Sequence, residues 1–104
     1  MTPEKILAVA RMYRERLERE HIPKHAMDPN RRFSPNMTGF HHQMLGHAHY
    51  MLDAVEQYAP DPSREQKTMQ RLAACQTLLW LAGWYTKNEI KSHLQEADEL
   101  AAID

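Results

Sequence analysis

The stretch Leu78–Lys91, LLWLAGWYTKNEIK, contains the end of one helix and the start of the next. Its apolar first half runs into Gly83, and glycine commonly takes the left-handed position that ends a helix. Thr86-Lys87-Asn88-Glu89 then has the pattern of a capping box, in which a threonine and a glutamate each bond the other's backbone amide. The stretch therefore predicts two helices joined by a short turn.

The helix that ends at Gly83 is predicted to begin after a proline-rich turn, with Asp61 as its N-cap and Pro62 as its first residue. Its inward stripe follows three- and four-residue spacing: Met69, Leu72, Ala73, Gln76, Leu79, Trp80 and Gly83. Leu78 and Leu81 widen this stripe, so the second half of the helix is apolar nearly all round. We expect that half to be the most buried part of the protein.

Two more amphipathic helices precede it. One should span residues 3–20 behind a Thr2 N-cap, and its stripe is Ile6, Val9, Ala10, Tyr13 and Leu17. The other should span residues 39–58 behind a Thr38 N-cap, and its stripe is Phe40, Met44, His47, Met51, Val55 and Tyr58, widened by Leu45, Ala48 and Leu52. The last helix should turn Ile90, Leu94, Ala97 and Ala101 inward.

These elements predict an all-α fold in a single domain, residues 1–104. We expect a compact bundle of three longer amphipathic helices plus a shorter C-terminal helix. A long loop, His21–Met37, should separate the first two helices, because Pro23, Pro29 and Pro35 forbid a continuous helix there. The composition, 42% hydrophobic and 26% charged, suits a chain that buries a core.

Several features bear on the cellular compartment. No apolar run approaches the roughly 18 residues that a membrane span needs, and the N-terminus lacks the apolar segment of a signal peptide. The single cysteine, Cys75, cannot form an intrachain disulfide and suits a reducing compartment. We therefore expect a cytoplasmic protein with no membrane partner.

Charge is distributed unevenly along the chain. The net charge of −1 argues against general nucleic-acid binding. Residues 1–35 hold eight Lys or Arg and five Asp or Glu, whereas residues 86–104 hold two and five. Such poles favour a homo-oligomer that associates head to tail, or an anionic partner near the first segment. The alternative is that both are ordinary solvated helix faces.

Histidine is conspicuous, with seven in the chain and four of them within residues 41–49. Two metal ligands on one helix need a spacing of three or four residues, but His42 and His49 lie seven apart. His49 and Asp53 are four apart on the same helix and could start a metal site, as could His93, but further ligands would have to come from other helices or other subunits. We expect His47 at the edge of the core with one nitrogen bonded, and His42 and His49 on a polar face.

The loop offers the best candidate for partner or anion binding. Arg31 and Arg32 next to Phe33 place guanidinium groups beside an aromatic ring, a combination enriched at interfaces and at phosphates. We expect the site to draw on these three residues and on Lys24, His42, His49 and Trp84. A solvated loop is the alternative.

Little in the chain indicates catalysis. Cys75 lies mid-helix beside the most apolar stretch, where a thiol is usually inert. Gln76 lies on the apolar stripe and needs a hydrogen-bond partner in the core, at a subunit interface or on a ligand. We therefore expect no catalytic residue, no resident metal and no cofactor, and a protein that is not an enzyme.

Two stretches carry a resemblance to known proteins. They are Ala48–Asp53 with Val55 and Glu56, and the Leu78–Lys91 stretch in which a Trp-rich helix end runs through glycine and Tyr-Thr into a last helix. Over about half of the chain these resemble short helical accessory proteins of phages, prophages and mobile elements. The resemblance implies action by binding in a host cytoplasm, either by blocking a host defence factor or by sequestering a nucleotide signal as an oligomer.

Three functions follow in order of preference. The first is a small non-enzymatic binding protein that acts through a protein–protein surface, as a phage-type inhibitor of a host defence factor does. The second is an oligomeric sponge for a small anionic ligand such as a nucleotide. The third is a metal-dependent helical-bundle enzyme with His42, His49, Asp53 and His93 as ligands.

Overall fold

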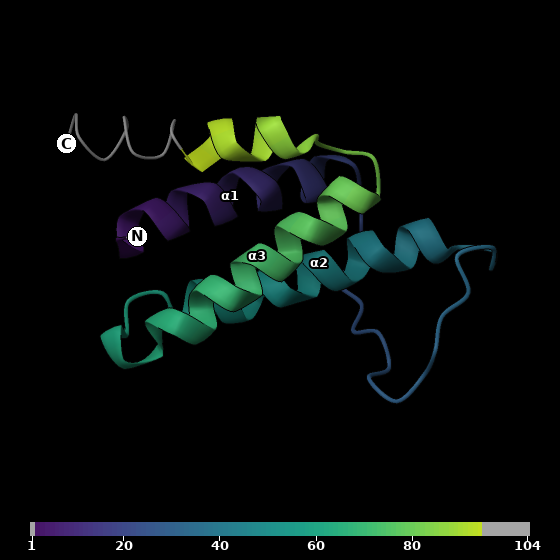
Figure 1. Ribbon diagram of the computed structural model, residues 1–104, viewed down its shortest axis with the longest axis horizontal. Helices are drawn as coiled ribbons and strands as arrows, with labels where there is room; N and C mark the ends of the chain where they lie inside the picture. Colours follow the sequence, from purple (N-terminus) through teal and green to yellow (C-terminus); the bar gives the residue numbers. More distant parts are fainter. Residues whose placement is uncertain (1, 95–104) are drawn as a thin grey trace.

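The structure, a computed structural model, describes residues 2–94 of the 104-residue chain. Every regular element in that range is helical: α1 (Pro3–Arg19), α2 (Phe40–Tyr58), the 3-10 turn η1 (Pro62–Arg64), α3 (Glu65–Leu81) and a further helix over residues 87–94. Consecutive helices run in opposite directions, α3 packs against α2, and the helix over residues 87–94 lies beside α1 (Figure 1). The predicted all-α bundle with a long loop between the first two helices is confirmed.

The first helix begins at the predicted residue, Pro3, and ends at Arg19, one residue before the predicted end. Thr2 Oγ1 accepts a hydrogen bond from the Lys5 amide at 3.3 Å, and Pro3 is the first helical residue. All five predicted stripe residues of α1 are buried. The chain leaves α1 through His21, which has a φ of 58°, and the Ile22 amide bonds back to the Leu17 carbonyl at 2.9 Å.

The second helix is central, because both α1 and α3 pack against it. The predicted Thr38 cap is wrong: Gly39, with a φ of 81°, precedes the helix, and no side chain caps it. The predicted stripe is rotated, since Phe40, His47, Met51 and Tyr58 are only partly buried. Neighbours on two sides bury five of the predicted residues, Met44, Leu45, Ala48, Leu52 and Val55, together with Gly46 and His49, which were not predicted.

The third helix begins as predicted but exposes more of its second half than predicted. Asp61 caps the turn that leads into it, because its Oδ1 accepts from the Ser63 amide at 3.0 Å. The buried residues are Thr68, Leu72, Cys75, Gln76 and Leu79. Ala73 and Trp80 are exposed instead, and Leu81 is 60% exposed. The predicted maximum of burial there is wrong because α2 covers α3 from one side and α1 barely reaches it.

The quoted stretch folds as its residues predict. Gly83 has a φ of 84°, and the Trp84 amide bonds to the Leu79 carbonyl at 3.0 Å, which closes α3 with a Schellman motif. The capping box is formed in both directions, at 3.1 Å from the Thr86 amide to Glu89 Oε1 and at 3.0 Å from the Glu89 amide to Thr86 Oγ1. Ile90 is buried, whereas the expectations for Ala97 and Ala101 lie outside the described residues.

Across residues 2–94, no helix combines the length and the apolarity that crossing a membrane requires.

Candidate functional site

The seven residues predicted for partner or anion binding fall into different environments. Lys24 and His42 do come together, since both line a cavity of about 460 Å³ with Pro23, His25 and Gln43. The charge of Lys24 is already engaged, because its Nζ lies 3.0 Å from Asp53 Oδ1. The lysine in the wall of this cavity is therefore already paired with a carboxylate.

The Arg31–Phe33 pairing forms as predicted, but it serves the loop itself. The Arg31 guanidinium lies 5.1 Å from the centroid of the Phe33 ring. The Phe33 ring in turn lies 6.4 Å from that of Phe40 in the first turn of α2. Arg32 is exposed. These contacts attach the middle of the loop to the start of α2.

The interpretation that placed His49 on a polar face is wrong. Its side chain is 5% exposed, and its Nδ1 lies 2.7 Å from the Ile22 carbonyl oxygen. The chain that follows α1 covers this side of α2, so a ligand at the surface cannot reach the ring.

Three of the four residues considered as metal ligands are engaged elsewhere, and the fourth, His42, is exposed. His49 bonds the loop, Asp53 pairs with Arg14 and Lys24, and His93 Nδ1 lies 3.1 Å from the Tyr13 hydroxyl. In the part of the chain that the structure describes, no three His, Cys, Asp or Glu side chains form a group that could hold an ion.

An arginine that sequence reasoning missed ties α1 to α2. Arg14 reaches Asp53 Oδ1 through Nη2 and Glu56 Oε1 through Nε, both at 2.7 Å. Partial burial opposes ionisation of Asp53, but hydrogen bonds from Lys24 and Arg14 outweigh it and lower its pKa. The three-residue spacing of Asp53 and Glu56 on one helix face was the available signal.

A buried polar chain connects three helices, as the position of Gln76 predicts. Gln76 Nε2 donates to the Tyr13 hydroxyl at 3.2 Å, and that hydroxyl also shares a hydrogen bond of 3.1 Å with His93 Nδ1. Burial raises the pKa of Tyr13, so the phenol stays protonated. Gln76 thus finds its partner inside the core.

The predicted inertness of Cys75 agrees with its surroundings. Its Sγ is fully buried and lies 3.6 Å from the Ala48 carbonyl oxygen. Burial raises the pKa of the thiol to about 12, so the reactive thiolate is scarce near neutral pH.

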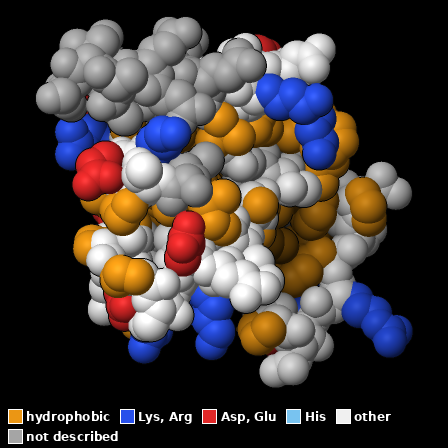
Figure 2. Space-filling model, turned by 60° about the vertical axis from the view of Figure 1, so that its left-hand side comes forward, with side chains coloured by type: hydrophobic (Ala, Val, Ile, Leu, Met, Phe, Trp, Pro, Cys, Tyr) orange, Lys and Arg blue, Asp and Glu red, His pale blue; other side chains and the backbone are white. Residues whose placement is uncertain are grey.

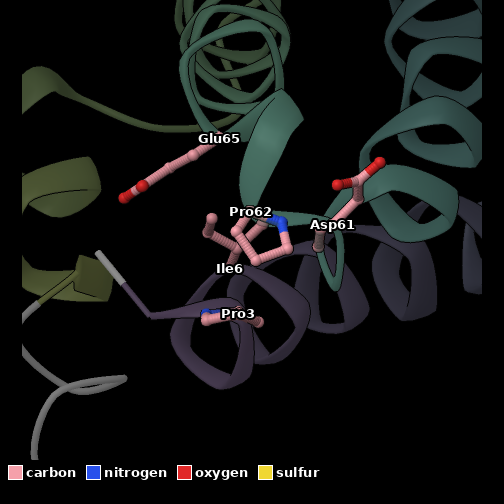
Figure 3. Close-up of a pocket in the computed structure, with 6 residues that line it drawn as sticks. Pro3, Ile6, Asp61, Pro62 and Glu65 are labelled. Carbon is pink, nitrogen blue, oxygen red and sulfur yellow. The ribbon is translucent and has the colours of Figure 1, made fainter.

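A smaller cavity of about 120 Å³ lies where the start of α1 meets the link between α2 and α3. Pro3, Ile6, Ala59 and Pro62 give it an apolar lining. Its two carboxylates, on Asp61 and Glu65, point to different sides (Figure 3). Because Asp61 caps the turn at Ser63, the pair is not arranged for joint acid–base chemistry.

The most distinctive surface lies at the C-terminal end of α3. Trp80 and Leu81 are 39% and 60% exposed. The Lys87 ammonium lies 4.9 Å above the Trp80 ring, and the Arg16 guanidinium lies 4.5 Å from the Trp84 ring. We call these five residues the α3-end surface.

Arg16 is held in place by several contacts. Its guanidinium also lies 4.8 Å from the Tyr85 ring, and its Nη1 donates to the Trp84 carbonyl at 3.2 Å. The side of the molecule that Figure 2 brings forward differs, since acidic and basic side chains are mixed there among hydrophobic ones. Aromatic rings topped by cations therefore set the α3-end surface apart, and only Trp84 of its members was predicted.

The fold and this surface define an all-α helical-bundle protein with an exposed aromatic and cationic patch. No family model matches the chain, and neither a curated protein nor a solved structure gives a significant match. The resemblance to phage accessory proteins thus stays a prediction from sequence.

Proposed function

We propose that this protein is a non-enzymatic binding protein whose α3-end surface takes a partner protein with an apolar anchor flanked by carboxylates. The observation that carries the proposal is the exposure of Trp80 and Leu81, with the Lys87 ammonium over the Trp80 ring and the Arg16 guanidinium over the ring of Trp84, four residues further along the chain. Tryptophan and arginine are the residue types that most often dominate binding energy at protein interfaces.

The apolar part of the surface supports a protein partner. Residues 72–85 carry no charged side chain, so the end of α3 presents a neutral strip to solvent. The core leaves out Trp80 and Leu81, because α3 buries its other face against α2. Exposed large apolar side chains with a polar rim are typical of docking sites.

The charges around the strip support an acidic partner. Lys87 and Arg16 project their cations over aromatic rings, which places positive charge at the rim of the apolar strip. A partner that brings carboxylates to these two positions would form charge-assisted hydrogen bonds while its apolar anchor covers Trp80. We extend the proposal to the role that the resemblance implies, inhibition of a host defence factor in the cytoplasm.

The experiment places a photo-reactive phenylalanine analogue at position 80, with position 50 as the matched control. Tyr50 is also an exposed aromatic, at 49%, but it lies on α2. We expect position 80, and not position 50, to cross-link one protein in the host cell. Equal cross-linking at both positions, or none at either, would count against the α3-end surface.

Calorimetry with the purified cross-linked partner then tests the contact directly. We expect Trp80→Ala and Leu81→Ser each to weaken binding at least tenfold, as hot-spot residues do, and Tyr50→Ala to leave it unchanged. Lys87→Glu should weaken binding most at low salt. Unchanged affinity in Trp80→Ala would overturn the assignment of the surface.

A second candidate, an anion sponge, has one observation in its favour, the cavity lined by Lys24, His25 and His42. Its lysine is shared with Asp53, which makes it the weaker candidate. Titration with a nucleotide panel, comparing the native chain with Lys24→Ala, decides it: saturable binding lost in the variant supports the sponge, and no heat from any nucleotide rejects it.

A further inference from the structure

The loop that follows α1 is bonded to one short segment of α2. The His25 amide donates to the Gly46 carbonyl at 3.0 Å, and the Met27 amide donates to His47 Nδ1 at 3.0 Å. The Ile22 carbonyl lies 2.7 Å from His49 Nδ1. Three hydrogen bonds therefore connect residues 22–27 to residues 46–49 of α2.

Close backbone approach makes these contacts possible. A Cβ atom added to Gly46 would lie 3.1 Å from both His25 Cβ and the Pro23 carbonyl oxygen. Glycine inside a helix is less favourable than alanine, so α2 gives up stability where the loop crosses it. The loop therefore crosses α2 at Gly46, where the missing side chain leaves room for the loop backbone.

The two histidines play opposite hydrogen-bonding roles. A backbone amide can only donate, so His47 Nδ1 must carry a lone pair and accept from Met27. A carbonyl oxygen can only accept, so His49 Nδ1 must carry a proton and donate to Ile22. Their responses to acid follow from these roles.

Only one of the two contacts depends on a lone pair of the ring. A proton on His47 Nδ1 removes the lone pair that holds the Met27 amide. His49 Nδ1 already supplies the proton of its bond to Ile22, so that contact has no lone pair to lose.

The surroundings of His47 favour its neutral form. Partial burial, and then the nearby charge of His25 in the loop, lower its pKa. On its own helix, the Tyr50 ring stacks on it with centroids 6.0 Å apart.

We propose that residues 26–31 form a proton-operated latch, which opens when His47 takes a proton at the atom that holds the Met27 amide. The segment stays tethered at both ends, by the His25 amide on Gly46 and by Phe33 against Phe40. The cavity lined by Lys24, His25 and His42 lies at the first of these tethers. The latch is independent of the α3-end surface.

Hydrogen exchange at the Met27 amide, measured by NMR and normalised to the intrinsic exchange rate, tests the latch. If only the open state accepts the proton, with an ordinary histidine pKa near 6.5, protection should fall by up to about 30-fold between pH 7.5 and pH 5. The Ile22 amide, which bonds to Leu17, should keep its protection.

Two variants at one position separate the latch from simple loss of structure. His47→Asn keeps an acceptor near the place of Nδ1 but does not titrate, so Met27 should stay protected at both pH values. His47→Ala should lose Met27 protection at both. His42→Ala, an exposed control, should behave as the native chain. A native chain whose Met27 protection is the same at pH 7.5 and pH 5 overturns the proposal, as does an unchanged pH response in His47→Asn.

Discussion

His21 holds a backbone conformation that suits glycine better than histidine. Its φ of 58° lies in the left-handed region, where it completes the Schellman motif that turns the chain out of α1. An L-residue with a Cβ pays a steric cost there that glycine avoids. The His21 side chain is exposed, so replacing it with glycine removes no buried contact.

We expect His21→Gly to stabilise the protein by about 0.5–1 kcal/mol, because relief of the left-handed strain exceeds the added chain entropy of glycine. Urea unfolding followed by circular dichroism measures the change. Glu20→Gly, one residue earlier and not in the left-handed region, is the control and should destabilise. A lower unfolding midpoint in His21→Gly would contradict the argument.

Single residues also show where sequence reasoning stops. Gln76 was predicted to find a partner because a buried amide must have one. Its partner, Tyr13, lies 63 positions away, and only the packing of α1 and α3 against α2 brings them together. The surroundings of His49 were predicted wrongly for the same reason, because the loop that covers it bonds it through the Ile22 carbonyl, 27 positions away in sequence. The residues around Gln76 in sequence show that its amide needs a hydrogen bond, but the identity of the partner depends on the tertiary fold.

At the level of elements, three of the four predicted N-caps formed, because caps depend on neighbours in sequence: Thr2, Asp61 and the capping box of Thr86 and Glu89. The fourth, Thr38, did not form, since Gly39 precedes α2. The rotation of α3 about its axis was not predicted. Its second half is apolar on every side, so the three- and four-residue spacing carries no direction there.

We expect Thr86→Ala to destabilise the protein by about 1 kcal/mol, because the Glu89 amide loses its acceptor at the start of the last helix. Thr77→Ala is a matched control, since Thr77 is exposed and bonds only back to the Ala73 carbonyl within α3. That control should be neutral or slightly stabilising. Guanidinium unfolding of both variants checks the difference, and equal losses would refute a special role for the cap.

At the scale of the whole molecule, acid should destabilise the fold in two stages. The pKa of His47 is lowered by burial and by His25, and the pKa of Asp53 is lowered because its ion pairs outweigh burial. In both cases the unfolded chain binds protons more readily than the folded one, so stability falls as the pH falls. The first stage begins near pH 6.5, and the second begins below about pH 4.

Unfolding midpoints in urea, measured from pH 8 to pH 3, should show both stages. His47→Asn should flatten the upper stage and leave the lower one. Asp53→Asn should lower stability at neutral pH, because Arg14 and Lys24 lose a charged partner, and should reduce the lower stage. Stability that rises on acidification between pH 7 and pH 5 would contradict the assignment.

Because Cys75 is buried, its reaction with a thiol reagent reports opening of the fold. The chain has no second cysteine, so a thiol label identifies one atom at the interface of α2 and α3. A maleimide or aromatic disulfide can reach that atom only when the two helices separate, so the labelling rate follows their opening. Comparing that rate with hydrogen exchange at Met27 would show whether the latch moves while the interior of the bundle stays closed.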